Sequence, residues 1–326
     1  MIAFITGGTG FIGSTLAETL LASGWEVHCL VRSPNILKWL HGLPVKLVAG
    51  DLFSESVLAK ALENATHVFH LAGLTKALTS AEYFHANSAA THVLLQACAL
   101  HAKRLERLIY VSSIAAAGPS RDRQPVREEE TPHPVSIYGR SKLAGEAACA
   151  EFTQRLPITI VRPPVVYGPR DRDVYEYFKQ VKWGLRLRPG FTPRYTSMIH
   201  VHDLVAGMML AAQHPRAPGQ TFFLTHAEFY EWSLLGEAIA HALQRKTVSI
   251  PIPLGLTPAV AAVSEIVAKI TRKPALLSFD KVREMRETHW ICSAEKARER
   301  LGFIAALPLA EGLRQTVLWY RAQGWL

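Results

Sequence analysis

Apolar residues in the first half of the chain fall into short runs that alternate with longer segments of helical periodicity. Several of the short runs are apolar throughout, as expected of strands that are covered on both faces of a sheet. We predict strands at 2–5, 26–31, 45–48, 67–71, 107–112 and 158–161. Helical patterns lie between them, near 12–22, 55–62, 81–101 and 137–155. Strands that alternate with helices in this way predict βαβ units and a parallel sheet.

The second half of the chain has a different rhythm. After Arg162, Pro-rich turns, short strands and mixed helices follow, and the chain ends in an amphipathic segment at 310–321. We therefore predict an α/β protein in which a doubly wound parallel sheet is joined to a smaller C-terminal α/β lobe. The sheet domain is assigned to residues 1–165 with a segment of about 200–225 returning to it, and the lobe to 166–199 and 226–326. The charged run at 120–130 is predicted to be a solvated loop over the sheet edge.

Size and composition fit a compact protein with a large core. The chain has 326 residues, of which 49% are hydrophobic, and this composition is too ordinary for disorder or a fibre. Met1 leads straight into an apolar strand without a secretory signal pattern, so we expect a cytoplasmic protein. The cysteines are widely separated and are predicted to be buried small hydrophobes, not disulfides or metal ligands; they are Cys29, Cys98, Cys149 and Cys292.

The formal net charge of +9 comes from scattered Lys and Arg residues, without a basic run or an RNA-binding signature. This favours a basic enzyme that attracts anionic ligands or surfaces, and it disfavours a nucleic-acid partner. One segment, 247–264, carries no charge and is long enough to raise the question of a membrane span. Its prolines, Pro251, Pro253 and Pro258, argue against one uninterrupted helix. We expect an apolar wall or a peripheral membrane contact there, with a role in the lobe's own core as the alternative.

A glycine-rich turn follows the first predicted strand and opens the first predicted helix. In TGGTGFIG, the residues Gly7, Gly10 and Gly13 form the pattern G-x-x-G-x-x-G within a βαβ unit. One glycine makes the tight turn, one lets the backbone approach a pyrophosphate, and one lets helix and strand pack closely. The free N–H groups and the positive end of the helix then hold the anion. We predict that this turn, with Phe11 and Ile12, binds a dinucleotide.

The second predicted strand is followed by Arg32, at a position where the residue type indicates which dinucleotide is bound. A free ribose 2′-hydroxyl usually meets an Asp or Glu about 20 residues beyond the glycines, whereas a 2′-phosphate favours an arginine. With Ser33 beside Arg32 and Lys38 one turn on, the sequence favours NADP(H), although a merely solvated Arg32 would leave NAD(H) open. Further cofactor contacts are expected where the third and fourth strands end, from Asp51, Leu52, Leu71, Ala72 and Gly73.

Tyr138 and Lys142 occur in YGRSK, four residues apart in a predicted helix, so they share one face. Ser113 ends the strand just upstream, and such strand-end and helix-face positions converge at the carboxyl edge of an open sheet. A lysine cation favours the phenolate of a nearby tyrosine and lowers its pKa, which makes a usable general acid and base. We expect Ser113 to hydrogen-bond the substrate oxygen and to align it for hydride transfer.

The same spacing occurs at Tyr175 and Lys179 in YEYFK. No strand ending in serines precedes this second pair. We therefore predict that Tyr175 is a packed aromatic residue on a helix of the lobe.

Motifs along nearly the whole chain resemble those of the extended short-chain dehydrogenases/reductases. They are TGGTGFIG, GDL, HLAG, Asn87 in its helix, VSSIAAAG, YGRSK, RPPVVYGP, MIHVHDL and SAEKARERLGF. The resemblance implies a Rossmann domain with a smaller substrate lobe and a catalytic set of Ser113, Tyr138 and Lys142. In this family pattern the lysine also binds the nicotinamide ribose.

The resemblance implies three further features. Pro163 and Val166 are expected near the nicotinamide carboxamide, and Asn87 has an architectural or proton-relay role. A homodimer is expected through the helices that contain Asn87 and Tyr138. The histidines His70, His200 and His202 fall at strand ends in the family pattern, and no metal site is assigned to them.

The branches of this superfamily differ in chemistry. Sugar-nucleotide enzymes commonly carry an arginine just ahead of the I-H-V segment, where it clamps the diphosphate. Here Thr196, Ser197 and Met198 occupy that place, and Arg194 is the one candidate to replace the clamp. The segments VRSP, 247–264 and KPALLSFDKV instead resemble reductases of the dihydroflavonol-reductase and 3β-hydroxysteroid-dehydrogenase kind.

We therefore predict an NADP(H)-preferring oxidoreductase that interconverts a secondary alcohol and a ketone on a small lipophilic substrate, whether steroid-like, polycyclic or long-chain. The alternative within the superfamily is a nucleotide-sugar epimerase or dehydratase. A catalytically idle redox sensor or NADP-binding scaffold is a third hypothesis, which the intact Ser113, Tyr138 and Lys142 set disfavours.

Overall fold

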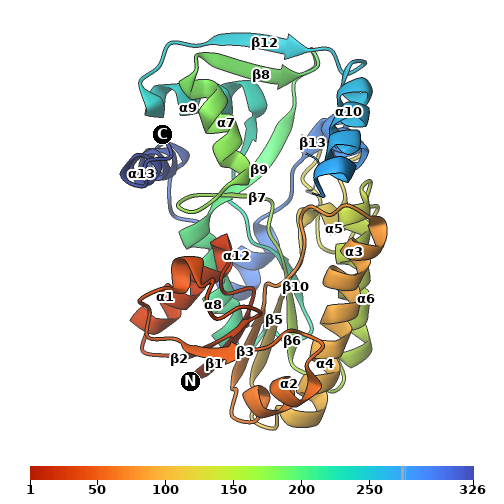
Figure 1. Ribbon diagram of the computed structural model, residues 1–326, viewed down its shortest axis with the longest axis vertical. Coiled ribbons are helices and arrows are strands. Elements are labelled where there is room, and N and C mark those ends of the chain that lie inside the picture. The colour runs from red at the N-terminus through yellow and green to blue at the C-terminus, as the bar shows by residue number, and fades with distance from the viewer. Residues whose placement is uncertain (273–274, 276) are drawn as a thin grey trace.

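Seven parallel strands form the central sheet of the computed structural model, which describes all residues except 273, 274 and 276. The strand order is β10-β6-β5-β4-β1-β2-β3 (Figure 1). Six of these strands are the predicted ones, at β1 Ile2–Thr6, β2 Glu26–Val31, β3 Lys46–Ala49, β4 His67–His70, β5 Arg107–Val111 and β6 Ile158–Arg162. The prediction of a doubly wound parallel sheet is confirmed.

Two layers of helices cover this sheet. Helices α1 (Phe11–Ala22) and α8 (Val201–Gln213) pack on one face, and α2 (Glu55–Leu62), α4 (Ala90–His101) and α6 (Ile137–Phe152) on the other. Successive residues of β1 serve the two layers in turn, with Ala3 and Ile5 in one core cluster and Phe4 in the other. This alternation explains why the strands are apolar throughout.

The predicted helix at 81–101 is interrupted in the structure. It consists of α3 (Ser80–Phe84), a π-helical turn at His85–Ala89 and then α4. A π-helical turn inserts one residue into the helix and is frequent at functional sites. Asn87 lies within it and is buried. Two short elements escaped prediction, the 3₁₀ turn Lys38–Leu40 and α5 (Ile114–Ala117), because each is too short to show a period.

The C-terminal lobe contains two small sheets. One has the order β11-β9-β13, with β7 also paired to β9, and the other joins β8 to β12 in parallel. Their strands are β7 Val165–Tyr167, β8 Leu185–Pro189, β9 Tyr195–His200, β11 Phe229–Glu231, β12 Val248–Ile252 and β13 His289–Trp290. The lobe helices are α7 Asp173–Lys182, α9 Trp232–Leu243, α10 Thr257–Thr271, α11 Phe279–Arg286 and α13 Leu309–Ala322. The core of the lobe lies between α7, α9 and α13.

Two segments of the second half belong to the sheet domain. Strand β10 (Thr221–Phe223) extends the sheet beside β6, and α8 packs on it. Helix α12 (Glu295–Leu301) also belongs to the sheet domain. Its residues Ala297 and Leu301, and Phe303 just after it, are buried in the same core cluster as β1. The assignment of all of 226–326 to the lobe is therefore wrong for this helix.

The loop at 120–130 is only partly solvated. Val126 is buried and pairs with Cys292, while the Glu128 carboxylate accepts a hydrogen bond of 2.7 Å from the backbone of Phe223 in the edge strand β10. The loop thus closes the sheet edge that it was predicted to cover. All four cysteines are buried and free, as predicted.

The uncharged segment 247–264 forms β12 and the first half of α10. Val248, Leu256 and Val263 are exposed while Ile252 and Leu254 are partly buried, so most of its large side chains lie outside the core of the lobe. No helix in the part of the chain that the structure describes is long and apolar enough to cross a membrane. The KPALLSFDKV motif that follows lies outside the described residues at 273, 274 and 276.

A buried ion pair joins helix α6 to strand β6. The Arg162 guanidinium donates to both carboxylate oxygens of Glu146, at 2.9 and 2.6 Å, and the Ser112 hydroxyl donates to the same carboxylate at 2.5 Å. Both charged side chains are almost fully buried. Removing one partner would leave the other charge buried without compensation.

Arg162→Met should therefore lower the free energy of unfolding by about 3–5 kcal/mol, measured by urea denaturation. The matched control is Arg314→Met, which breaks the exposed two-hydrogen-bond pair with Glu311 on α13. Solvent already screens that pair, so the control should unfold at nearly the wild-type urea concentration. Equal destabilisation by both variants would contradict the interpretation.

Candidate functional site

The glycine turn between β1 and α1 packs so closely that side chains are excluded. Gly7 has φ +76°, and a Cβ atom there would lie 2.7 Å from the backbone nitrogen of Ala72 at the end of β4. A Cβ atom on Gly13 would lie 2.3 Å from the carbonyl oxygen of Gly7. Gly7 therefore makes the turn and Gly13 brings helix α1 against it.

The first turn of α1 fits a dinucleotide pyrophosphate. Gly10 is the N-cap, and no side chain among the described residues caps this end of the helix. A Cβ atom on Gly10 would meet only the Gly7 carbonyl, at 3.2 Å, so its outer side is open. The backbone N–H groups that begin with Phe11 and Ile12 are thus presented with the positive end of a twelve-residue helix.

The ends of β2 and β3 place Arg32 close to Asp51. Both side chains are exposed, as is Ser33, and the Arg32 charge contributes to lowering the pKa of Asp51. The larger causes of this lowering are hydrogen bonds from Ser54 and Phe53. Arg32 is therefore a solvent-accessible cation at the edge of the sheet where the adenine ribose of a dinucleotide lies in Rossmann folds.

The end of β5 and the start of α6 bring Ser113, Tyr138 and Lys142 together. Ser113 follows β5 and caps α5, where its hydroxyl accepts a hydrogen bond of 3.1 Å from Ala115. Tyr138 lies in the first turn of α6 and is hydrogen-bonded to Ser113. Lys142 lies one turn further along α6, is buried, and donates to the Val111 carbonyl at 2.7 Å.

The electrostatic surroundings keep Tyr138 protonated. Burial raises the pKa of Tyr138 to about 12, and the negative charges of Glu284 and Asp173 act in the same direction. The hydrogen bond with Ser113 opposes this shift. The expected lowering of this pKa by Lys142 is therefore not what the structure shows. A phenol with such a pKa carries its proton throughout the neutral range.

Lys142 lies in a very different setting. Burial lowers its pKa to about 8, and the Glu146 carboxylate one turn along α6 partly restores it. The ammonium lies 4.5 Å from the centre of the Tyr110 ring. Glu146 was not predicted as a site residue, although it continues the four-residue spacing of Tyr138 and Lys142. That spacing was the signal by which Glu146 could have been found. The role of the Glu146 carboxylate is to balance the charge of Lys142.

Asn87 holds the loop after β4 against α6. Its side-chain oxygen accepts from Leu74 N at 2.8 Å, and its amide nitrogen donates to the Leu74 carbonyl and to Ser141 Oγ, both at 2.9 Å. A Cβ atom on Gly73 would lie 2.6 Å from that oxygen and 3.9 Å from Lys142 Nζ. These contacts give Asn87 an architectural role at the site.

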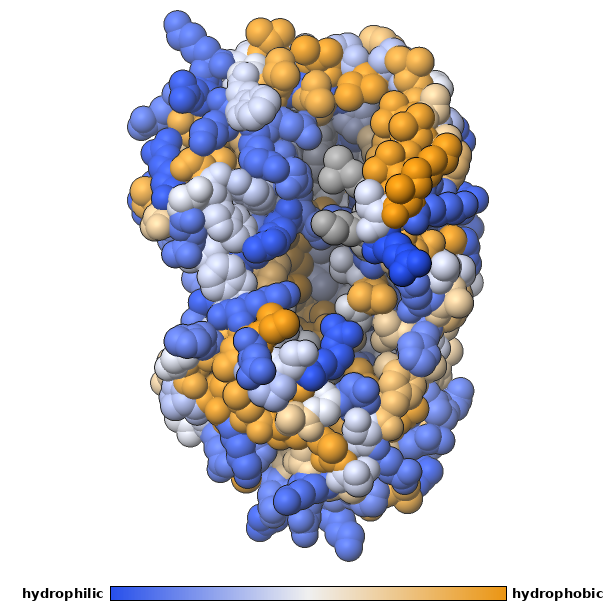
Figure 2. All heavy atoms as spheres, in the orientation of Figure 1, coloured by the Kyte–Doolittle hydropathy of each residue, from blue (hydrophilic) through white to orange (hydrophobic). Residues whose placement is uncertain are grey.

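The remaining predicted residues lie around the same sheet edge. Leu71 and Ala72 bond to Thr6 at the end of β1, and the Pro163 carbonyl accepts from Ile114 N at 2.9 Å. Val166 lies in β7, opposite Ile199 of β9, and Leu52 is buried beyond the end of β3. Strand β6 leads within three residues into β7, so this edge faces the lobe, and Figure 2 shows the surface hollowed between the two.

The second tyrosine–lysine pair has no such setting. The Tyr175 hydroxyl donates to the Trp325 carbonyl at 2.5 Å, and its ring packs on Tyr320 and Trp325. Lys179 forms an ion pair with Glu176 on the same helix. Tyr175 is a packed aromatic residue of the lobe, as predicted.

Asp280 was missed by the sequence analysis and contacts the start of helix α6 directly. It lies in α11 of the lobe, and its two carboxylate oxygens accept from Ile137 N at 2.6 Å and from Tyr138 N at 3.2 Å. A carboxylate at this position satisfies two free N–H groups and complements the positive end of α6. No local pattern reveals a contact between residues 143 positions apart in the chain.

Comparison with known proteins gives one family. A model of the NAD dependent epimerase/dehydratase family matches residues 3–224. The chain is 30% identical to a ceramide reductase of Caulobacter vibrioides, over all of this chain and 96% of that protein. It is 31% identical to a putative dihydroflavonol 4-reductase of Synechocystis, over 99% of this chain and 95% of that protein.

Among solved structures, the chain resembles a UDP-glucuronic acid 4-epimerase of Bacillus cereus in complex with UDP-glucuronic acid and NAD. The TM-score is 0.80 at 22% identity, and the match covers 99% of this chain and 100% of that one. At this identity the similarity shows the shared fold.

Asp280→Asn should lower the free energy of unfolding by about 1 kcal/mol and loosen the start of α6, because the helix loses its negative cap. Hydrogen exchange should show faster exchange of the Ile137 and Tyr138 amides. The control Asp122→Asn changes an exposed loop carboxylate that accepts from Gln124 N. If exchange at Ile137 and Tyr138 is the same in both variants, the cap contributes nothing.

Proposed function

Because the chain belongs to the NAD-dependent epimerase/dehydratase family, and thus to the extended short-chain dehydrogenases/reductases, we propose that it is an NADP(H)-preferring oxidoreductase acting on an apolar substrate. The reaction is the interconversion of a secondary alcohol and a ketone. The substrate is steroid-like, polycyclic or long-chain. The chain matches two relatives over nearly their whole length, and both are named as reductases, which supports this proposal.

The residues at the sheet edge divide the work of such a reaction. The bound cofactor supplies or accepts the hydride. Ser113 hydrogen-bonds the substrate oxygen, and Tyr138 donates a proton to that oxygen in the reductive direction. Lys142 supplies a positive charge next to Tyr138 and would bind the nicotinamide ribose. Asp280 holds the backbone of Tyr138 at the start of α6, and Asn87 holds Ser141 one turn further along. These contacts orient Tyr138 before substrate arrives.

The protonation state of Tyr138 fits the role of proton donor in the reductive direction. With a pKa of about 12, the phenol is a proton donor at neutral pH and a poor acceptor. Oxidation of an alcohol requires the phenolate, whose formation the nearby charges of Glu284 and Asp173 oppose. At neutral pH Tyr138 is therefore in the protonated form that donates to a ketone oxygen.

The hydrogen bonds that Arg194 makes within the lobe favour a reductase over the alternative, a nucleotide-sugar epimerase or dehydratase. Arg194 donates to the carbonyls of Pro189 and Glu287, at 2.7 and 2.6 Å, and so ties the lobe together. Thr196 and Ser197 beside it are buried in β9. The arginine that was the candidate for a diphosphate clamp is committed to backbone groups.

The preference for NADP(H) rests on Arg32. Its guanidinium is exposed at the end of β2, and the adjacent Ser33 hydroxyl is exposed as well. Both are donors of the kind that a 2′-phosphate binds. Asp51, which would favour a ribose hydroxyl, is already engaged by Phe53 N and Ser54 Oγ at 2.9 and 2.8 Å.

Arg32→Asp should weaken NADPH binding by about tenfold or more relative to NADH, because a charge-assisted hydrogen bond is replaced by repulsion. Fluorescence titration of both reduced cofactors measures the two dissociation constants. Arg104→Asp, at an exposed turn far from the glycines, is the control and should leave the ratio unchanged. An unchanged ratio in Arg32→Asp would remove this residue from cofactor selection.

A substrate screen tests the reaction itself. Steroid-like, polycyclic and long-chain ketones should oxidise NADPH, followed by absorbance, whereas nucleotide-sugars should give neither an absorbance change nor an epimerised product by chromatography. Tyr138→Phe should reduce turnover by at least about 100-fold with cofactor affinity retained, since it removes the proton donor. Tyr175→Phe removes only the bond to Trp325 and should retain turnover.

The outcomes separate the two hypotheses. Conversion of a nucleotide-sugar without net change in cofactor absorbance would establish the epimerase or dehydratase alternative. Loss of turnover in Tyr175→Phe with retention in Tyr138→Phe would mean that the wrong pair was assigned.

A further inference from the structure

Helix α10 turns its large apolar side chains away from the protein. Leu256, just before the helix, and four residues within it recur at intervals of four, three, four and three residues, which places them on one stripe. The stripe consists of Leu256, Val260, Val263, Val267 and Ile270, and all five are more than half exposed, Ile270 at 77%. Figure 2 shows an orange, hydrophobic surface where α10 lies in Figure 1.

The buried face of the same helix is made of small residues. Thr257, Ala261 and Ala268 are its buried positions. An ordinary surface helix buries its largest apolar residues and exposes polar ones. Helix α10 shows the opposite arrangement, with small residues buried and large apolar residues exposed. Packing within the protein therefore does not explain the apolar stripe.

The neighbouring two-stranded sheet is reversed in the same way. Val248 of β12 pairs with Leu185 of β8, and both are exposed, as is Ile250 two residues further along β12. The alternate positions point inward, where Arg186 donates to Glu237 on α9 at 2.8 Å. The inner face of this sheet is polar and its outer face is apolar. Both reversed elements lie at the same end of the lobe (Figure 1).

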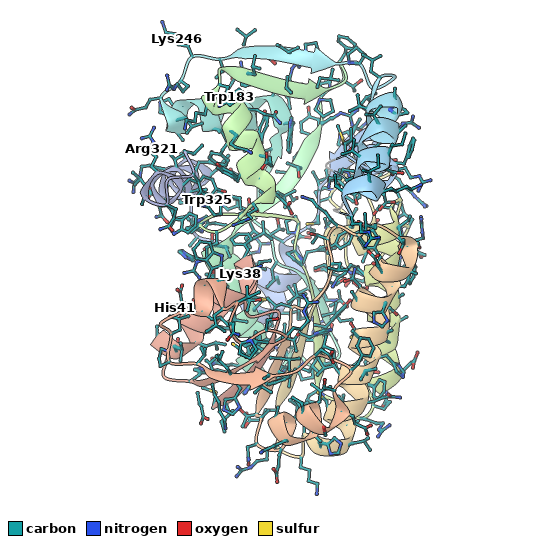
Figure 3. All side chains as sticks on the ribbon, viewed as in Figure 1. Lys38, His41, Trp183, Lys246, Arg321 and Trp325 are labelled. Carbon is teal, nitrogen blue, oxygen red and sulfur yellow. The ribbon has the colours of Figure 1, made fainter. Side chains whose placement is uncertain are left out.

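An aromatic residue and cations accompany this apolar end. Trp183, just before β8, is 82% exposed, and Lys246, just before β12, points away from the molecule (Figure 3). Residues 245–272 contain four cations, Arg245, Lys246, Lys269 and Arg272, and one acid, Glu265. The Glu265 carboxylate accepts a hydrogen bond of 2.8 Å from Phe279 N in the next helix, so its charge is partly offset.

We propose that α10 and the outer face of β8 and β12 bind the surface of an anionic lipid bilayer. An apolar stripe on a helix lies in the interfacial plane of a membrane, exposed tryptophan favours that interface, and Lys and Arg bind anionic headgroups. The helix has fifteen residues and lies on the bilayer rather than crossing it. A second copy of this chain fits the face less well, because it would bring two sets of cations together.

The docked helix is connected to the catalytic helix. Leu277 N donates to Ser264 Oγ at 3.3 Å and Phe279 N to Glu265, so α11 is fastened to α10. The next residue, Asp280, caps the helix that carries Tyr138. If the proposed function holds, a lipophilic ketone dissolved in the bilayer has a short path to Tyr138. The lipid binding itself does not depend on that function.

Vesicle co-sedimentation tests the proposal without cofactor or substrate. The wild-type chain should sediment with vesicles of phosphatidylcholine and phosphatidylglycerol, and less with phosphatidylcholine alone or at high salt. The double variant Val263→Glu/Val267→Glu places charges on the apolar stripe and should reduce binding at least about tenfold. Both positions are exposed, so circular dichroism should show an unchanged fold.

The matched control is Leu318→Glu on α13, whose side chain is 49% exposed against 51% for Val267. It should sediment like the wild type. A wild-type chain that stays in the supernatant with anionic vesicles overturns the proposal, and so does a double variant that sediments as well as the control. A wild-type dimer that the double variant converts to a monomer, without any lipid binding, assigns the face to a second copy instead.

Discussion

The close approach of helix α6 to the end of β5 is the constraint on which the site depends. A Cβ atom on Gly139 would lie 2.2 Å from the Ala115 carbonyl oxygen, and one on Gly145 would lie 2.1 Å from the Tyr110 hydroxyl. Only glycine permits this distance at both places. Because the helix is so close, Lys142 reaches the Val111 carbonyl and Tyr138 reaches Ser113. A helix one side chain further out would separate the phenol from the serine.

The same close packing buries the charge of Lys142, and Glu146 and Arg162 compensate for this burial. Burying Lys142 against β5 lowers its pKa to about 8 and would cost the site its positive charge. The Glu146 carboxylate restores part of that charge, and Arg162 with Ser112 in turn neutralises the carboxylate. Lys142, Glu146 and Arg162 are thus one connected unit that links α6 to β5 and β6. The fold and the charge of the site are stabilised by the same contacts.

Local patterns in the sequence predicted the sheet, the glycine turn and the convergence of Ser113, Tyr138 and Lys142, because strand period, turn chemistry and helix spacing are all short-range. Four features escaped because they depend on distant parts of the chain. Asp280 caps α6 across 143 positions, and α12 returns to the sheet domain. The segment 247–264 was correctly recognised as apolar, but apolarity does not distinguish a buried face from an outward one. The pKa of Tyr138 depends on burial and on Glu284 and Asp173, which no motif contains.

Two groups of charged side chains in the lobe bear on these features. The carboxylates of Asp173, Asp280 and Glu284 face the region around Tyr138, whereas the cations of 245–272 lie around the apolar stripe of α10. Each of these carboxylates is paired with a cation, Asp173 with Lys76, Glu284 with Lys281 and Asp280 with Arg283, so their negative charges are offset around Tyr138. The net positive charge of 245–272 lies beside the outward apolar stripe, where the anionic headgroups of the bilayer proposed above would complement it.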